Sequence, residues 1–265
     1  MTATALSIAG SDPSGGAGIQ ADHKTFASHG VYGCSVITAC TAQNTRGVEA
    51  VEILPASFVR QQLQTLRDDV AISAAKTGML ATAAIIDAVV EHLHSQPLPQ
   101  LVVDPVMVAT SGHRLLDQSA EDALRQHLLP LAQVITPNLP EIGVLLRTPP
   151  PQTIDDMRAC AHALWQLSGA AVYLKGGHGQ GDDNDALVDI FFDGQAMTVF
   201  TYPRIATRNT HGTGCSLAAA ITAQLARAVP LPDAVAKARA WMQQAITAGV
   251  ALHIGRGNGP IDHRV

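Results

Sequence analysis

Short apolar segments alternate with longer segments of helical periodicity along almost the whole chain, and this alternation limits the possible folds more than any single motif. Strands are predicted at residues 4–9, 34–39, 72–75, 101–107, 134–135 and 171–174. Helices are predicted at residues 19–27, 55–67, 82–94, 153–167, 213–228 and 232–250. Strands that alternate with helices pair in parallel and are covered by helices on both faces. We therefore predict an α/β chain with three layers, α/β/α, around a mostly parallel central sheet, in a single domain over residues 1–265.

One region departs from this rhythm. Segments 186–192 and 196–202 flank Asp193-Gly194, a dipeptide typical of a two-residue hairpin turn. The segment before them, 179–185, is polar and rich in glycine. We expect a small β-hairpin there, preceded by a flap.

Composition excludes several classes of function. A formal charge of −5 and a pI near 6.1 leave no basic surface for nucleic acid or an anionic membrane. No apolar run approaches the length of roughly 18 residues that spans a bilayer, and the N-terminus lacks the pattern of a signal peptide. The four cysteines show no CxxC spacing, so neither a zinc site nor a disulfide framework is indicated. We expect a reduced, cytoplasmic protein without nucleic-acid or membrane partners.

Polar and glycine-rich loops follow most of the predicted strands. Ligands of open α/β sheets bind outside the carboxyl ends of the strands. The loops that meet at this edge contain residues 10–18, 41–45, Asp104, 138–141, Lys175 and 212–215. The sequence therefore predicts one ligand cleft that gathers these loops.

Residues 209–215 (NTHGTGC) lead from a flexible turn directly into an alanine-rich helix. Gly212 and Gly214 let a ligand approach the backbone, and the unpaired N–H groups at a helix start bind anions. Cys215 lies in the first turn of that helix, where a thiol pKa is expected to be lowered. An anion site beside a potential base suits phosphoryl transfer. The alternative is an ordinary loop-to-helix junction with a buried cysteine.

Three charged side chains follow neighbouring strands. Asp104 and Glu141 are acids near the ends of two strands, where carboxylates could hold Mg²⁺ directly or through water. For Glu141, an acid in the first turn of a helix is the alternative interpretation. Lys175 stands beside paired glycines at a strand end, where it could meet phosphate oxygens, although the Walker A order GK[ST] is absent.

Gln43 follows a strand in what we predict to be a polar turn. Its amide offers a donor and an acceptor side by side, which suits the edge of a heteroaromatic ring. A turn residue that bonds its own backbone is an equally good interpretation. Met79 at a strand end could pack on a flat ring, although a core methionine is the commoner case.

The glycine-rich loop 10–18 also allows two interpretations. Residues 16–21 fit the dinucleotide pattern GxGxxA, but no acid follows the next strand to hold a ribose. Closure over a small substrate is favoured, with Asp12 and Asp22 available to it. Both carboxylates could instead cap helices or lie in solvent.

The motifs together resemble one known family, the hydroxymethylpyrimidine/phosphomethylpyrimidine kinases of the ribokinase-like superfamily. They cover nearly the whole chain in order: 9–22 (AGSDPSGGAGIQAD), 41–45 (TAQNT), 76–80 (KTGML), 104–107 (DPVM), 136–141 (TPNLPE), 175–178 (KGGH) and 210–215 (THGTGC). The resemblance implies a ribokinase-like fold and an enzyme that uses ATP and Mg²⁺. Its substrate would be 4-amino-5-hydroxymethyl-2-methylpyrimidine, phosphorylated first to the monophosphate and then to the diphosphate in thiamine biosynthesis.

The resemblance also implies roles for individual residues. The pyrimidine would be bound by Gln43, Asp22, Met79 and Gly10. Mg²⁺ would be supported by Asp104 and Glu141, and the nucleotide would meet Asn138, Lys175 and Thr213. The anion hole would consist of Gly212, Thr213 and Gly214, with Cys215 in the position of the base. The wider superfamily commonly has Asp at that position, so a true base and a positioner of the substrate hydroxyl both stay open.

Two further functions compete with this interpretation. A pyridoxal kinase of the same superfamily is the nearest, and a non-catalytic sensor of a nucleotide or vitamin precursor belongs to a different class. Lys175, the glycine turn and Cys215 occur together, which argues against a sensor. By analogy with the family we expect a homodimer.

Overall fold

The computed structural model describes residues 2–98, 100–108, 115–177 and 186–265. The segment 179–185, predicted to be a flap, lies outside the described residues. The elements in chain order are β1 Thr4–Ala9, α1 Gly18–Ser28, β2 Tyr32–Ile37, β3 Ala39–Asn44, β4 Gly47–Ile53, α2 Ala56–Arg67, β5 Ala74–Thr77, α3 Ala83–Ser95, β6 Leu101–Val103, α4 Ala120–Ala123, a π-helical turn Leu124–Leu128, a 3₁₀ turn Leu129–Leu131, β7 Val134–Ile135, α5 Leu139–Leu146, α6 Ile154–Ser168, β8 Ala171–Leu174, β9 Ala186–Phe192, β10 Met197–Pro203, α7 Thr213–Ala226 and α8 Leu231–Gly249.

The central sheet has the order β10-β9-β8-β7-β6-β5-β1-β2, eight strands among the described residues. Every pair from β2 to β8 is parallel, whereas β9 and β10 are antiparallel and extend one edge. The carboxyl ends of β1, β5, β6, β7 and β8 therefore lie along one edge of the sheet. Strand β6 is shorter than predicted because Pro105 cannot donate a ladder hydrogen bond.

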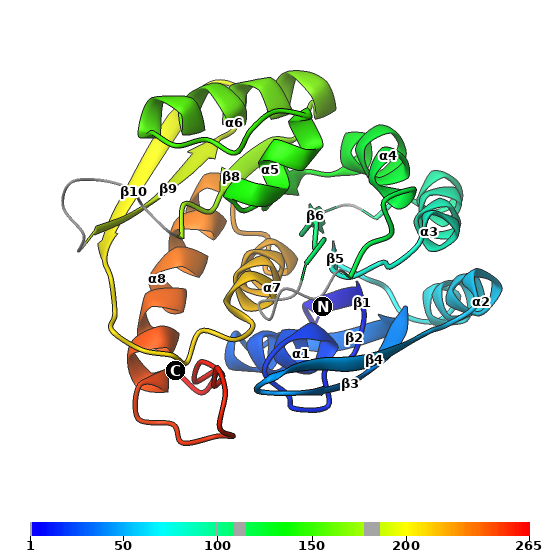
Figure 1. The fold of residues 1–265 in the computed structure, drawn as a ribbon. Coiled ribbons are helices and arrows are strands. Elements are labelled where there is room, and N and C mark those ends of the chain that lie inside the picture. The colour runs from blue at the N-terminus through cyan, green and yellow to red at the C-terminus, as the bar shows by residue number, and fades with distance from the viewer. Residues whose placement is uncertain (1, 99, 109–114, 178–185) are drawn as a thin grey trace.

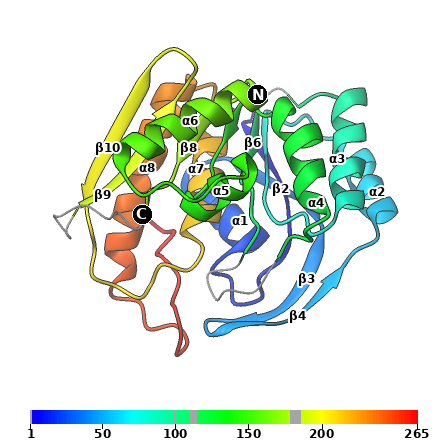
Figure 2. The ribbon, with the colours of Figure 1, turned by 45° about the horizontal axis from the view of Figure 1, so that its top comes forward.

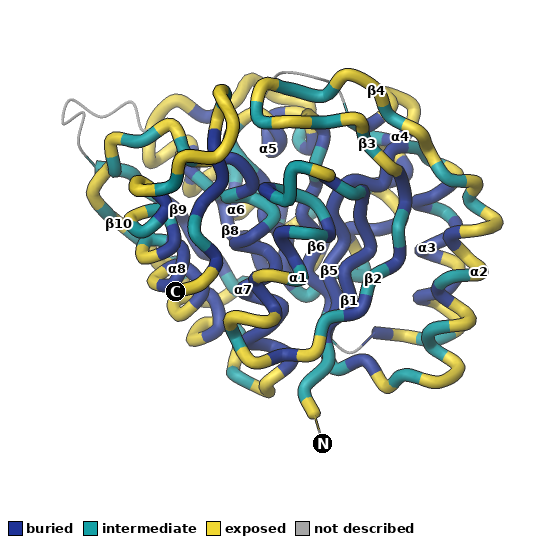
Figure 3. The backbone as a smooth tube through the Cα atoms, turned by 90° about the horizontal axis from the view of Figure 1, so that it is seen from below, coloured by how far each residue is buried: buried dark blue, intermediate teal, exposed yellow. Residues whose placement is uncertain are grey.

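Helices cover both faces of this sheet, which confirms the predicted three layers (Figures 1 and 2). Helices α2 to α6 pack on one face in a core that includes Leu6 and Val103. Helices α1, α7 and α8 pack on the other face against Ala5, Val102 and neighbouring strand residues. Successive side chains of a strand point to opposite faces, so β1 and each strand from β5 to β9 contribute residues to both cores. In Figure 3 the dark blue, buried backbone runs through β1, β5 and β6.

The strand period also explains where two unusual buried polar residues lie. Ser7 of β1 and Lys76 of β5 are fully buried. Ser7 shares the parity of Ala5, and Lys76 that of Ala74, so both face α1 and α7. The α1/α7 face of the sheet therefore carries polar side chains beneath the carboxyl-end loops.

A hairpin missed by the sequence analysis projects beside this edge. Strands β3 and β4 form a separate two-stranded antiparallel sheet with a register shift between Ala42 and Gln43. The prediction that Gln43 lies in a turn is therefore wrong, because Gln43 belongs to β3. The hairpin around Asp193-Gly194 is confirmed, although its strands β9 and β10 join the central sheet rather than standing apart.

No helix among the described residues is long and apolar enough to cross a membrane.

Candidate active site

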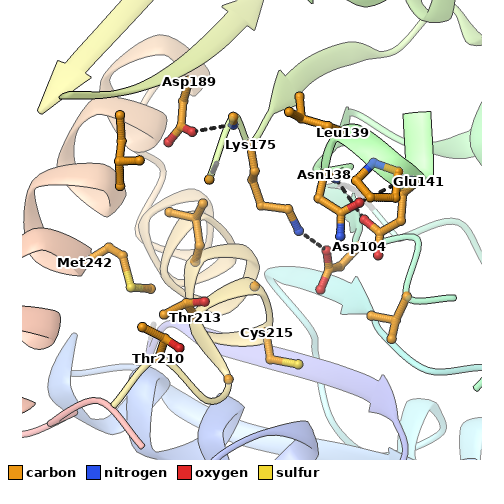
Figure 4. Close-up of a pocket in the computed structure, with 18 of the residues that line it drawn as sticks. Asp104, Asn138, Leu139, Glu141, Lys175, Asp189, Thr210, Thr213, Cys215 and Met242 are labelled. Atoms are coloured by element: carbon orange, nitrogen blue, oxygen red, sulfur yellow. Dashed lines mark hydrogen bonds and ion pairs between the residues drawn. The ribbon is translucent and has the colours of Figure 1, made fainter. Parts of the chain in front are cut away.

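A cleft of about 1780 Å³ opens at the carboxyl ends of the parallel strands. Its lining comes from the loop after β1, the β3–β4 hairpin, the ends of β6, β7 and β8, and the N-terminus of α7. In Figure 4, Cys215 and Thr213 lie between the Asp104–Glu141 group and Met242. The predicted convergence of loops on one cleft is confirmed. Its volume exceeds that of an ordinary small-molecule pocket, about 300–1000 Å³, and leaves space for two ligands.

Gly212 forms the turn that begins α7. Its φ of 80° is left-handed, and a Cβ there would lie 1.7 Å from the carbonyl oxygen of Gly16. Only glycine accepts both conditions. Thr213 and Gly214 follow as the first helical residues, and all three line the cleft. The N-terminus of a 14-residue helix thus faces the cleft, as an anion site requires.

Cys215 also lines the cleft, but its predicted low pKa is wrong. Burial raises the pKa of the thiol to about 11, and the charge of Lys76 and the N–H of Gly18 offset this only in part. The helix N-terminus favours thiolate, but the loss of hydration outweighs it here. The neutral thiol is therefore the resting form at neutral pH.

Lys175 and Asp104 form an ion pair on the floor of the cleft. Lys175 Nζ lies 2.9 Å from Asp104 Oδ1, which also accepts a hydrogen bond of 2.9 Å from Thr136 Oγ1 (Figure 4). Burial alone would lower the pKa of Lys175, but Asp104 and Glu141 raise it above its ordinary value. The ammonium therefore stays charged, opposite the N-terminus of α7.

Asn138 and Glu141 form a capping box at the start of α5. Asn138 Oδ1 accepts from Glu141 N, and Glu141 Oε2 accepts from Asn138 N, both at 2.8 Å. The alternative that Glu141 is a first-turn helix acid is thus correct for the structure. Burial raises the pKa of Glu141 to about 7, with Lys175 lowering it and Asp104 raising it.

Asp104 and Glu141 are nevertheless close enough to influence each other electrostatically, and both line the cleft. Their oxygen atoms are the donor type that Mg²⁺ prefers. Burial is the main cause of the raised pKa of Glu141, and repulsion by Asp104 adds to it; a cation there would relieve that repulsion. Groups of three or more His, Cys, Asp or Glu residues suited to a metal do not occur among the described residues. Substrate phosphates would have to complete a Mg²⁺ site, as is common for this ion.

The other end of the cleft is lined by Gly10, Met79 and Gln43, as predicted. Met79 is mostly buried with Ala39 and Ala81, and its carbonyl accepts a 2.6 Å hydrogen bond from Thr38 Oγ1. A Cβ on Gly10 would meet Met79 Sδ at 3.1 Å. Met79 gives this end an apolar surface, and the Gln43 amide is one of its polar groups.

Asp22 does not line the cleft, so its predicted substrate contact is wrong. Its carboxylate is fully buried on α1, where both oxygens lie 3.0 Å from Lys76 Nζ and Oδ2 accepts from Ser7 Oγ. Burial lowers the pKa of a lysine, but nearby acidic groups, Asp22 first, raise that of Lys76 above its ordinary value. No role for Lys76 is predicted from the sequence, although a lysine inside an apolar strand is a usable signal.

Asp12 and His211 form a second pair at the cleft that the sequence analysis missed. His211 Nε2 lies 2.7 Å from Asp12 Oδ2, and both side chains are mostly buried. Asp12 also accepts from Ser14 and Ala17 in the glycine-rich loop. The alternative that Asp12 caps the start of a helix is thus nearer to the structure than a contact with substrate, because its oxygens already accept hydrogen bonds from the loop and from His211.

The end of the cleft near α8 contains a group without a predicted function. Asp189 of β9 accepts from Gly176 N at 2.8 Å and from Tyr173 Oη at 2.7 Å. Arg239 of α8 lies 3.3 Å from Asp189 and stacks 3.2 Å from the ring centroid of Tyr202. An aspartate inside the apolar strand β9 was the signal that could have identified this group.

Comparison with known proteins identifies relatives over nearly the full length of the chain. A model of the family described as phosphomethylpyrimidine kinase matches residues 12–262. The hydroxymethylpyrimidine/phosphomethylpyrimidine kinase of Rhizobium meliloti (strain 1021) is 49% identical over 263 residues, which cover 99% of this chain and 97% of that protein.

Solved structures share the fold. The phosphomethylpyrimidine kinase from Clostridium difficile 630 is 40% identical with a TM-score of 0.81, over 92% of this chain and 99% of that one. The pyridoxal kinase from Staphylococcus aureus in complex with AMP-PCP and pyridoxal is 35% identical with a TM-score of 0.89, over 100% of this chain and 94% of that one. The predicted ribokinase-like fold is therefore confirmed.

Proposed function

The chain belongs to the phosphomethylpyrimidine kinase family, and from this premise we propose that it uses ATP to phosphorylate 4-amino-5-hydroxymethyl-2-methylpyrimidine. The product would be phosphorylated again to the diphosphate, as thiamine biosynthesis requires. The observation that carries the proposal is that one cleft brings together an end lined by Met79 and the Gln43 amide and a charged anion site. A sensor of the vitamin precursor alone would not need the second of these features.

The pyrimidine would occupy the end lined by Gly10, Met79 and Gln43. A 4-aminopyrimidine presents a ring nitrogen acceptor next to an amine donor, and one glutamine amide can pair with both. Met79 would pack on the ring face, since a thioether adapts to flat apolar surfaces. This arrangement supports recognition of the aminopyrimidine edge.

Phosphoryl transfer would take place between the N-terminus of α7 and Lys175. The N–H groups of Gly212 and Gly214, the positive end of the α7 dipole and the charged Lys175 would stabilise negative charge on the transferred group. The N–H of Thr213 donates to Thr210 O at 3.3 Å, so Thr213 would contribute through its place in the first turn of the helix. Cys215 would position the substrate hydroxyl rather than remove its proton early, because its thiol is neutral at rest. A hydroxyl proton that leaves late in the reaction needs no strong base.

Asp104 and Glu141 would hold Mg²⁺, with Asn138 and Lys175 beside the nucleotide phosphates. When bound, Mg²⁺ neutralises charge between the phosphates. Asp104 already accepts from Lys175 and Thr136, which fixes the direction of its carboxylate. Glu141 is oriented by its bond from Asn138 N.

A substrate comparison tests the proposal. Pyridoxal carries a phenolic oxygen and an aldehyde near its reacting arm, so it cannot pair with the Gln43 amide in the same way. An unpaired buried amide costs about 1–3 kcal/mol, or about 5- to 150-fold in selectivity. We expect kcat/KM to favour the aminopyrimidine, and Gln43→Leu to erode that preference. A wild-type preference for pyridoxal would establish a pyridoxal kinase instead.

The family resemblance further supports a homodimer that acts in the cytoplasm, where ATP is available. Light scattering on the purified protein tests the assembly, and a monomer at micromolar concentration would contradict it.

A further inference from the structure

Four polar side chains from three separate segments meet at the pyrimidine end of the cleft. Asp12 comes from the loop after β1, Thr41 and Gln43 from β3, and His211 from the turn before α7. The distances are 2.7 Å from Asp12 Oδ2 to His211 Nε2, 3.4 Å from His211 Nε2 to Gln43 Nε2, and 3.1 Å from Gln43 Oε1 to Thr41 Oγ1. These contacts form one continuous row along the cleft wall.

The first contact determines which nitrogen of His211 carries a hydrogen. Asp12 Oδ1 accepts from Ser14 N and Ser14 Oγ, and Oδ2 accepts from Ala17 N. Burial raises the pKa of Asp12, but hydrogen bonds from His211 and Ser14 bring it below its ordinary value, so the group is a carboxylate. A carboxylate only accepts hydrogen bonds. His211 Nε2 therefore carries a hydrogen and donates it to Asp12, in the neutral ring and in the imidazolium alike.

The donors and acceptors around it also determine the orientation of the Gln43 amide. With its nitrogen toward His211, two N–H donors would face each other. With its oxygen toward Thr41, it would face a hydroxyl whose single hydrogen already goes to Ser11 O at 2.8 Å. A half-turn of the amide removes both conflicts. The nitrogen then donates to Thr41 Oγ1, and the oxygen takes the position beside the electropositive Nε2–H of His211, whose single hydrogen stays donated to Asp12 Oδ2. The oxygen and the nitrogen of a glutamine amide are assigned from the hydrogen-bond partners that surround them.

We propose that Asp12 and His211 are specificity-determining positioning residues, which lock the amide of Gln43 with its oxygen toward His211 and its nitrogen toward Thr41. The proposal rests on the proposed function and names how that site orients its substrate. The amide keeps one N–H and one oxygen lone pair for a ligand, in a fixed order along the wall.

This order sets the direction in which the pyrimidine lies. Ring nitrogen N3, the amine on C4 and the hydroxymethyl group on C5 follow one another around the substrate. N3 pairs with the Gln43 nitrogen on the Thr41 side, and the amine pairs with the oxygen on the His211 side. The hydroxymethyl group then comes next beyond the amine, toward His211 and the following Gly212, where the anion site begins. A reversed amide would turn the reacting hydroxyl away from it.

A matched pair of ligands tests the lock. In the 4-oxo analogue of the substrate, ring nitrogen N3 donates and the C4 oxygen accepts. The order of donor and acceptor on the edge that pairs with the Gln43 amide is therefore reversed. We expect the wild-type protein to bind the 4-amino compound more tightly by calorimetry, by about 5- to 150-fold for each mismatched group. His211→Phe keeps a ring but removes the donor, so the amide can rotate and the ratio of the two Kd values should fall at least about tenfold.

Conservative variants separate positioning from structure. His211→Gln retains an N–H donor and should restore much of the ratio. Ser14→Ala disturbs the same loop through Asp12 Oδ1 only, and should leave the ratio unchanged. A merely structural role of His211 would weaken both ligands equally, and an unchanged ratio in His211→Phe overturns the lock. If that variant does not fold, Thr41→Val removes the acceptor at the other end, and an unchanged ratio there overturns it as well.

Nuclear magnetic resonance of ¹⁵N-histidine protein reports the hydrogen directly. A proton on His211 Nε2 at neutral pH supports the lock, and a bare Nε2 overturns it. The proposed function fails separately: a wild-type protein that binds the 4-amino compound with the expected ratio but never phosphorylates it keeps the lock and loses the kinase.

Discussion

Replacement of Gly212 by alanine tests whether the turn before α7 is the anion site. Gly212 has φ 80°, and an added Cβ would lie 1.7 Å from Gly16 O and 2.8 Å from Gly16 C. The left-handed conformation alone costs a residue with a Cβ about 1–2 kcal/mol. Real Cβ contacts stay beyond 3.0 Å, so the two backbone segments must also separate by about 1.3 Å.

A displacement of this size moves the N–H groups that would hold the transferred phosphoryl group. Misplacement of a catalytic group by about 1 Å can lower a rate about 100-fold. We therefore expect Gly212→Ala to reduce kcat about 100-fold and to lower the free energy of unfolding by more than 1–2 kcal/mol, roughly the cost of the conformation alone. Steady-state kinetics and urea unfolding measure the two effects.

Gly169→Ala is the matched control. Gly169 ends α6 with φ 72°, and a Cβ there would meet nothing within 4 Å. This variant should lose about 1–2 kcal/mol of stability from the conformation alone and keep its kcat. A Gly212→Ala protein that keeps kcat within about threefold of wild type, a change below 1 kcal/mol, would refute the assignment of the turn as the anion site.

Three further predictions concern charge and protons. Cys215→Ala should lower kcat about 100-fold and leave the Kd of the pyrimidine unchanged. Cys215→Ser should retain more activity if the side chain only positions the substrate hydroxyl. Near-normal turnover of the alanine variant would exclude Cys215 both as a base and as a positioner. Asp104→Asn should raise the Mg²⁺ concentration that gives the half-maximal rate. In the wild type, activity lost on addition of EDTA should return with Mg²⁺. If the variant needs the same Mg²⁺ concentration as the wild type, the role of Asp104 is structural. Burial lowers the pKa of His263 from 6.5 to about 4, so the unfolded chain binds the extra proton between these values. The contribution of His263 to stability should be complete above pH 6.5 and fall by about 3 kcal/mol toward pH 4. Urea unfolding of the wild type and of His263→Gln at each pH measures it as the difference between the two proteins, in which the opposite contribution of Glu141 cancels.

The layers of the fold were predictable because they follow from local periodicity. Alternating strands and helices imply a covered parallel sheet, and the strand period places alternate residues on opposite faces. The β3–β4 hairpin was not predictable in the same way. Its residues alternate little in polarity, and a register shift at Gln43 interrupts the pairing.

The site was predictable where a local motif determines it and not where tertiary burial does. The glycine turn at Gly212 could be identified because positive φ and close backbone approach are properties of a short segment. The pKa of Cys215 could not be, since burial by other elements outweighs the helix N-terminus. Asp22 was misplaced because its partner Lys76 is 54 residues away and lies on another strand.

The most direct test of the proposed kinase is the mass of its products. Purified protein is incubated with ATP, Mg²⁺ and 4-amino-5-hydroxymethyl-2-methylpyrimidine, and the pyrimidine species are followed by mass spectrometry over time. The proposed function predicts a monophosphate that appears first and a diphosphate that follows. ATP turnover without a phosphorylated pyrimidine, or a phosphorylated product from pyridoxal alone in a parallel reaction, would contradict it.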